Sequence, residues 1–247
     1  MWTYIAGSVR GTSHEKTGQR LQDAHRCFVA DNYLVAIACD GAGSSSHGGE
    51  GASLAARRIS SLALAHVREH QILPCDAKIR DWVDETRDLI AQAAVSRGLG
   101  LRDFATTLVL ALASRDELLC AHIGDGAIAV RENESGAWTS VSWPEHGEYA
   151  STTYFLTDDT EPRLRISSTA VAFDTLVLMT DGLERLALDF ALRSPHGPFL
   201  DVMAAPLRGL APGRPATINR ALTTYLQSAA VNARTDDDKT LIVAVRT

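Results

Sequence analysis

The stretch YLVAIACDGAGSSSHGGEGA, residues 33–52, runs from an apolar strand through Asp40 and Gly41 into a loop of small residues, and then into a predicted helix. A carboxylate at the end of a buried strand, beside glycines that let a backbone or a ligand approach closely, is either a turn device or part of a site. The rest of the chain has to decide between these two interpretations of Asp40.

The length and charge of the chain limit the classes of protein it can belong to. Its 247 residues are within the range of one large domain, so we predict a single domain over residues 1–247. The 24 basic and 30 acidic residues give a net charge of −6. Because no cluster of Lys and Arg forms a stripe that could follow a phosphate backbone, we expect no nucleic-acid partner.

Neither the start of the chain nor its cysteines indicate export or a membrane. The first residues, MWTYIAGSVRGTSHEK, contain no basic leader region, and no long uninterrupted apolar run occurs anywhere. The four cysteines show no C-x-x-C spacing and are interpreted as reduced thiols. We therefore expect no membrane segment and a cytoplasmic location.

Hydrophobic periodicity predicts the order of the elements in the first half of the chain. Two strands joined at Asp31-Asn32 are predicted within residues 25–40, because that pair tolerates the backbone of a tight hairpin. Helical spacing of apolar residues predicts helices over 48–70 and 76–96. Residues 106–142 contain four short β-rich runs separated by turns of hairpin length, and these predict a four-stranded antiparallel meander.

The second half mixes strands with further helices. A strand pair turning at Asp174 is predicted within residues 163–182, and a last strand follows the polar turn at 236–238. Helical segments are predicted at 183–192, 199–207 and 215–230. Antiparallel strands interrupted by pairs of helices indicate an α+β fold, a four-layer α-β-β-α sandwich of two mainly antiparallel sheets flanked by helices.

Residues 143–161 break this pattern. The segment is acidic and irregular, and it contains Trp143, Tyr149, Tyr154 and Phe155. Long irregular loops in compact domains commonly carry function. Aromatic residues in such a segment most often serve packing, whereas the acidic and irregular context favours the alternative, a flap that faces the substrate.

An aspartate followed by glycine ends an apolar run three times, at Asp40, Asp125 and Asp181. Asp-Gly is a favoured hairpin turn, and Asp125, with strands on both sides, fits that interpretation best. Asp40 and Asp181 fit it poorly, because a loop or a helix follows each of them. These two aspartates are therefore candidates for a site.

Two more acidic positions lie at predicted strand ends, Asp23 and the run 236–238. If the two sheets stack, strand ends at one edge converge, and several carboxylates can share a small volume only when cations neutralise them. All-oxygen ligands favour hard ions such as Mg²⁺ or Mn²⁺. Two such ions about 4 Å apart can generate a hydroxide nucleophile and hold a phosphoryl group for attack.

Six motifs, taken together and in this order, resemble those of the metal-dependent serine/threonine protein phosphatases of type 2C, in their compact bacterial form. The resemblance covers the chain from Ile5 to Val245. The motifs are GSVRGTSHEKTGQRLQDAH (7–25), ACDGAGSSSHGGEGA (38–52), ATTLVLAL (105–112), AHIGDGAIAV (121–130), LMTDGLERL (178–186) and DDDKTLIVAV (236–245).

The resemblance implies a binuclear metal centre with Asp40 and Asp23 as catalytic residues. Asp40 would bridge both ions, and Asp23 would bind one ion directly or through its waters. Asp125 would serve a weaker third ion, and Asp237 is the alternative to Asp238. The implied metal ligands are Asp23, Asp40, Gly41, Asp125, Asp181 and Asp238.

The resemblance leaves the phosphate-binding residue open. Many members of the family carry an arginine five residues before the first aspartate, where this chain has Gly18. Arg20, His14 and Arg10 are the candidates. Eukaryotic members also have a histidine after the Asp-Gly pair, where this chain has Ala42, so a water would protonate the leaving oxygen.

The resemblance thus implies a protein phosphatase that hydrolyses phosphoserine and phosphothreonine by direct attack of a hydroxide bridging two Mg²⁺ or Mn²⁺ ions. The partner would be a phosphorylated protein, either a target of a serine/threonine kinase or the kinase itself. The alternative is a catalytically weak pseudophosphatase that binds phosphoproteins as a regulator. The missing arginine favours this alternative, whereas the retained acidic positions favour the enzyme.

Overall fold

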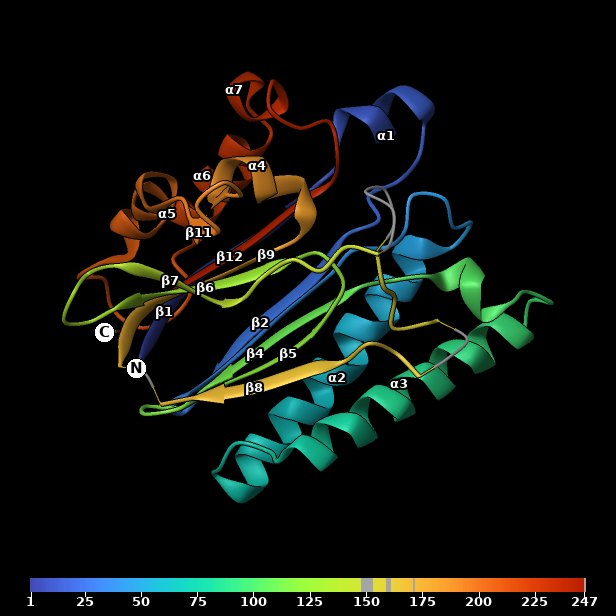
Figure 1. Ribbon diagram of the computed structural model, residues 1–247, viewed down its shortest axis with the longest axis horizontal. Coiled ribbons are helices and arrows are strands. Elements are labelled where there is room, and N and C mark those ends of the chain that lie inside the picture. The colour runs from blue at the N-terminus through green and yellow to red at the C-terminus, as the bar shows by residue number, and fades with distance from the viewer. Residues whose placement is uncertain (148–152, 159–160, 171, 247) are drawn as a thin grey trace.

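A computed structural model describes the chain apart from residues 148–152, 159–160, 171 and 247. Within the described residues, two five-stranded antiparallel sheets stack on each other (Figure 1). The first has the order β1-β12-β9-β6-β7 and consists of Trp2–Val9, Lys239–Arg246, Phe173–Met179, Ala127–Glu132 and Trp138–Ser142. The second has the order β2-β3-β4-β5-β8 and consists of Ala24–Ala30, Tyr33–Cys39, Leu108–Ala113, Leu118–Ile123 and Arg165–Thr169.

Helices cover the outer faces of both sheets, so the predicted four-layer α+β sandwich is confirmed (Figure 1). Two long helices, α2 (Gly48–His70) and α3 (Asp76–Val95), pack on the second sheet. The first sheet is covered by α4 (Glu184–Ala187), α5 (Gly197–Ala204), α6 (Ala216–Leu226) and α7 (Ala229–Asn232). A further short helix, α1 (Thr12–Thr17), and three 3₁₀ turns, η1 (Leu101–Phe104), η2 (Asp181–Leu183) and η3 (Ala205–Leu207), complete the described helical segments.

The central strand β3 shows why the layers stack in this way. Val35 and Ile37 point to the helices α2 and α3, whereas Leu34 and Ala36 point to the opposite sheet. All four side chains are fully buried. Because successive residues of a strand face opposite sides, an uninterrupted apolar run is buried on both faces. Each large aliphatic side chain buried in this way contributes about 1.5–3 kcal/mol to stability.

Several predicted elements are confirmed. The hairpin of β2 and β3 turns at Asp31, whose φ of 52° is the left-handed conformation that such a turn needs. Helices α2 and α3 begin and end within one residue of their predicted bounds. The sequence analysis missed β1, which pairs with β12 from the opposite end of the chain.

Two predicted strand pairings are wrong. The meander over 106–142 does not form, because β4 and β5 belong to the second sheet while β6 and β7 belong to the first. The strands predicted to turn at Asp174 are β8 and β9, which also lie in different sheets, and Asp174 lies within β9. Turn residues indicate where the chain reverses, but they do not specify which sheet the next strand joins.

The predicted helix over 183–192 is also only partly correct. It consists of η2 and the single turn α4, and a small hairpin of β10 (Leu188–Asp189) and β11 (Ser194–Pro195) follows. The segments predicted at 199–207 and 215–230 do contain helices, α5 with η3 and α6 with α7. No helix among the described residues has the length and apolar character needed to cross a membrane.

Candidate metal centre and active site

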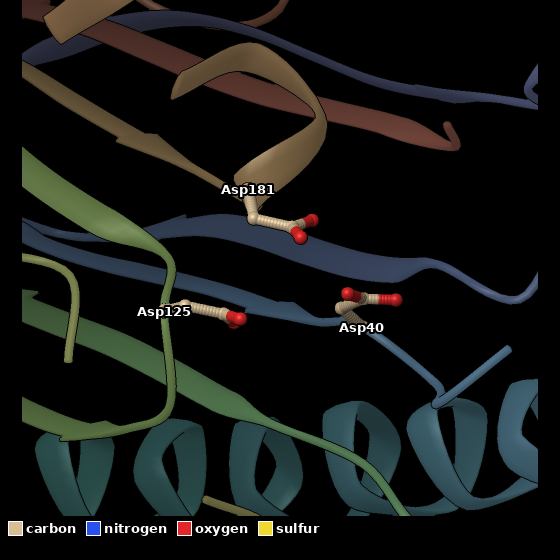
Figure 2. Close-up of side chains that lie close together, drawn as sticks. All are labelled: Asp40, Asp125 and Asp181. Carbon is tan, nitrogen blue, oxygen red and sulfur yellow. The ribbon is translucent and has the colours of Figure 1, made fainter. Parts of the chain in front are cut away.

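Three carboxylates converge where the two sheets meet. Asp40 follows β3, Asp181 follows β9, and Asp125 lies in the connection from β5 to β6. One side-chain oxygen from each lies within 4.8 Å of the others. Figure 2 shows Asp181 approaching from the first sheet, and Asp40 and Asp125 pointing into the same space from below it. The sandwich therefore brings together three residues that are more than 50 positions apart in the sequence.

Backbone hydrogen bonds hold Asp40 in place. Its N–H donates to the hydroxyl of Thr107 (2.9 Å), and the N–H of Thr107 donates back to the Asp40 carbonyl (2.8 Å). Both threonines of the motif at 105–112, Thr106 and Thr107, are buried. The Thr-Thr pair is thus the partner of the Asp40 strand end, and this leaves the Asp40 carboxylate directed into the space between the sheets.

The glycine that follows each of the three aspartates is explained by close backbone contacts. A Cβ at Gly41 would lie 2.2 Å from the backbone of Gly48, and one at Gly182 would lie 1.8 Å from the carbonyl oxygen of Asp238. At Gly126 it would lie 2.7 Å from the carbonyl oxygen of Met179. Real Cβ atoms do not come so close. The three Asp-Gly pairs therefore mark tight approaches between segments and do not mark hairpin turns.

The interpretation of Asp125 as a hairpin residue is wrong, because Asp125 lies on the chain that crosses from one sheet to the other. The left-handed residue of this crossing is Gly124, with φ 105°. Asp125 is 9% exposed, and its Oδ1 has no hydrogen-bond partner. A buried carboxylate oxygen without a partner needs a cation or a proton.

Burial and mutual repulsion raise the pKa values of the cluster. Burial raises the pKa of Asp40 well above its usual range, and the neighbouring charges of Asp23 and Asp181 raise it further. The pKa of Asp181 is raised by burial and then by Asp125 and Asp237. The charged forms of these groups are thus destabilised together, as expected of carboxylates that share a small volume.

The residues of this cluster fit a divalent cation. A cation would neutralise the repulsion between the carboxylates and give the free Oδ1 of Asp125 a partner. The described donors are carboxylate oxygens, without histidine or cysteine, and such a set suits Mg²⁺ or Mn²⁺ better than zinc or copper. We therefore assign the cluster as a candidate metal centre.

Asp23 is a buried neighbour of Asp40. Its Oδ2 accepts hydrogen bonds from the hydroxyls of Thr180 (2.8 Å) and Thr240 (2.7 Å), while its buried Oδ1 has no partner outside the carboxylates. Burial, with the charge of Asp238 adding to it, raises the pKa of Asp23 to about 7. Asp23 is therefore held by residues at the strand ends of the first sheet, and its second oxygen is left facing the other carboxylates.

The two adjacent aspartates Asp237 and Asp238 face different surroundings. The carboxylate of Asp238 accepts the N–H groups of Gly11 and Gln22 (both 2.6 Å) and lies 2.9 Å from His14 Nδ1. Asp237 lines the cavity that contains Asp40, Asp125 and Asp181, and its charge raises their pKa values. This geometry favours the alternative of the sequence analysis, Asp237, over Asp238 as a metal ligand.

The candidate phosphate-binding residues of the sequence analysis do not line this cavity. Arg20 is exposed beyond α1. Arg10 donates weakly to the carbonyl of Gln19 and lies 3.9 Å from Glu15. His14 is buried against Asp238. The sequence motifs therefore do not locate the basic side chain that would bind the phosphate of a substrate.

An open cavity of about 750 Å³ surrounds the carboxylates, and part of the predicted flap forms its wall. The described residues 153–158 are tied to the core, because the N–H of Leu156 donates to the Thr106 carbonyl and Arg87 donates to the carbonyls of Leu156 and Asp158. Tyr149 and the rest of 148–152 lie outside the described residues. The sequence analysis missed Arg102, Thr153 and Thr157, which also line the cavity.

Comparison with known proteins identifies the family. The family model of protein phosphatase 2C matches residues 10–227 of this chain. The chain belongs to the protein phosphatase 2C family. Serine/threonine-protein phosphatase 3 of Escherichia coli (strain K12) is 34% identical over 250 residues, which cover 99% of this chain and 98% of that protein. The predicted family is therefore confirmed, and with it the prediction of a protein phosphatase.

Solved structures share the fold of this phosphatase. A bacterial serine phosphatase superposes with a TM-score of 0.70 at 14% identity, covering 99% of this chain and 97% of that chain. Serine/threonine phosphatase Stp1 from Staphylococcus aureus superposes with a TM-score of 0.67 at 15% identity, covering 100% and 96%. At these identities the likeness shows the fold, and the roles of individual site residues stay predictions.

The raised pKa of Asp23 predicts how pH affects the stability of the metal-free phosphatase. The folded state binds a proton at Asp23 up to about pH 7, whereas in the unfolded chain the pKa is 3.8. The free energy of unfolding therefore falls as pH rises between these values. Burial lowers the pKa values of His25 and His122, so these residues act in the opposite sense below about pH 6.5.

The effect of Asp23 is isolated by comparing Asp23→Asn with the wild type. We expect the melting temperature of the metal-free variant, minus that of the wild type, to increase from about pH 5 to about pH 8. The variant keeps an acceptor for Thr180 or Thr240 and removes the titrating charge. Thermal denaturation in EDTA across this range checks the result, and a difference that does not change with pH would contradict it.

Proposed function

We propose that this phosphatase hydrolyses phosphoserine and phosphothreonine in proteins, using two Mg²⁺ or Mn²⁺ ions held by Asp40, Asp125, Asp181 and Asp237. The observation that carries the proposal is the convergence of three carboxylate oxygens within 4.8 Å in an open cavity. When bound, such ions lower the pKa of water to supply a nucleophile and withdraw charge from the phosphoryl oxygens.

The protein's own residues have separate tasks in this proposal. Asp40 would help to hold both ions, because its carboxylate converges with those of Asp125 and Asp181. Asp23 keeps one buried oxygen next to Asp40, and this oxygen would accept a hydrogen bond from the attacking water. The hydroxyls of Thr180 and Thr240 fix the orientation of Asp23, so that its free oxygen stays directed at the centre.

The proposed substrates are phosphorylated proteins of the cytoplasm. The cavity is open, so a side chain projecting from a protein surface can enter it. The relatives in Escherichia coli and Staphylococcus aureus are both named as serine/threonine phosphatases. A target of a serine/threonine kinase, or the kinase itself, fits these observations.

Hydrolysis of p-nitrophenyl phosphate and of a phosphothreonine peptide by the wild type tests the proposal. We expect turnover of both substrates with Mn²⁺ or Mg²⁺, and its loss when EDTA is present. The alternative, a pseudophosphatase that only binds phosphoproteins, predicts peptide binding without turnover. The cluster of Asp40, Asp125, Asp181 and Asp237 favours the enzyme, and the absence of metal-dependent turnover would contradict it.

A further inference from the structure

One basic side chain, Arg102, is found among the described residues that line the cavity of the carboxylate cluster. We infer that the Arg102 guanidinium binds the phosphoryl group of the substrate, an inference that rests on the proposed phosphatase function. Arg102 belongs to η1, which precedes β4, and it is an exposed residue of the cavity wall. No motif of the sequence includes this residue.

The backbone around Arg102 is fixed relative to Asp40. Residues 102–107 run beside residues 40–47 and are bonded to them along their whole length. The carbonyl of Arg102 accepts the hydroxyl of Ser45 (2.9 Å), and the Ala105 carbonyl accepts the N–H of Ala42 (2.9 Å). The last link is the pair of bonds between Thr107 and Asp40 described above.

A second set of bonds closes the base of η1. The carbonyl of Asp103 accepts the N–H of His47 (2.8 Å), and its carboxylate accepts the hydroxyl of Ser46 (2.9 Å) and the N–H of Gly100 (2.9 Å). These contacts leave η1 little freedom to move relative to the metal centre. The backbone of Arg102 is therefore held in a fixed position, which reduces the entropy cost of binding a ligand.

The charge of the cavity requires such a residue. A phosphate monoester is an anion, and the described lining of the cavity includes six aspartates, Asp40, Asp103, Asp125, Asp158, Asp181 and Asp237. Metal ions offset the carboxylates, but the phosphoryl oxygens that point away from the ions still need donors. A guanidinium binds two such oxygens with paired N–H groups, a geometry that lysine does not offer.

The arginines near the first motif are placed less well for this task. Neither Arg10 nor Arg20 lines the cavity. They precede β2 and flank α1, whereas Arg102 lies in η1, bonded to the loop that follows Asp40. The position at which the family usually has an arginine is Gly18, with φ 74° and no atom near enough to touch an added Cβ. Phosphate binding is thus assigned to η1 and not to the segment that precedes β2.

Arg102→Ala, Arg102→Lys and Arg20→Ala test the inference, with the exposed turn variant Arg115→Ala as the matched control. Two quantities are measured with Mn²⁺ present: the affinity for inorganic phosphate by calorimetry, and KM and kcat for p-nitrophenyl phosphate and a phosphothreonine peptide. We expect Arg102→Ala to weaken phosphate binding and to raise both KM values by about 10- to 100-fold, the loss for a charged hydrogen-bonding pair. Arg102→Lys should recover part of the affinity, and Arg115→Ala should match the wild type.

Three outcomes would overturn the inference. The first is an unchanged phosphate affinity in Arg102→Ala, and the second is a rise in KM confined to the peptide, which would make Arg102 a contact for the peptide chain. The third is a loss in Arg20→Ala that Arg102→Ala does not show. Failure of the proposed function is seen separately, as a wild type that binds phosphate through Arg102 without metal-dependent turnover.

Discussion

Replacing Asp40 with Asn is expected to lower Mn²⁺-dependent turnover by at least about 100-fold, because even residues that only support metal ligands change activity by 10- to 100-fold. The Asp40 carboxylate lies close to those of Asp125 and Asp181, so its loss removes a donor from the middle of the proposed centre. The amide keeps the backbone bonds between Asp40 and Thr107. The variant should therefore fold, and kcat/KM for p-nitrophenyl phosphate measures the loss.

A second readout separates metal binding from chemistry. Mn²⁺ should raise the melting temperature of the wild type, because a ligand that binds only the folded state stabilises it. This rise should be much smaller in Asp40→Asn. Asp116→Asn, in the exposed turn between β4 and β5, is the control and should show wild-type turnover and a wild-type rise. Full turnover in Asp40→Asn would rule out a metal centre at this position.

The parts of the fold that follow local patterns could be predicted from the sequence. The apolar run of β3 and the helical spacing in α2 and α3 are local signals, and they predicted those elements closely. The partners of β1 and β6 depend on contacts with strands far along the chain, β12 and β9. Because alternation within a strand says nothing about such distant neighbours, the assignment of strands to sheets could not be predicted.

The candidate site shows the same limit at the level of single residues. Asp40 and Asp181 could be recognised because no returning strand follows either of them. Asp125 has strands on both sides, and a turn within a hairpin and a crossing between sheets have the same local signature. Arg102 carries no signal at all, because only the pairing of residues 102–107 with 40–47 brings it to the cavity.

Adjacent aspartates cannot be distinguished by sequence pattern, although their side chains face different environments. Asp238 is 2% exposed and bonded to two backbone N–H groups, whereas Asp237 lines the cavity. Exchanging each of them for Asn should therefore have different consequences. Asp237→Asn is expected to lower metal-dependent turnover by about 100-fold, as for a lost metal contact. It should not destabilise the metal-free protein, because it removes a charge that repels Asp40 and Asp181.

Asp238→Asn is expected to act chiefly on stability. An amide offers one acceptor oxygen where the carboxylate offers two, so the N–H of Gly11 or of Gln22 would lose its partner. A buried donor left without a partner costs about 1–3 kcal/mol. For a protein of this size, that lowers the melting temperature by about 2–12 °C.

The contrast between the two variants is measured by the Mn²⁺ concentration needed for half-maximal activity, together with the metal-free melting temperature. We expect Asp237→Asn to require far more Mn²⁺ at a wild-type melting temperature. Asp238→Asn should melt earlier and require less additional Mn²⁺ than Asp237→Asn. A large Mn²⁺ effect in Asp238→Asn alone would instead make Asp238 the ligand. Because both oxygens of Asp238 already accept backbone N–H groups, the backbone around Gly11 and Gln22 would then have to rearrange when metal binds.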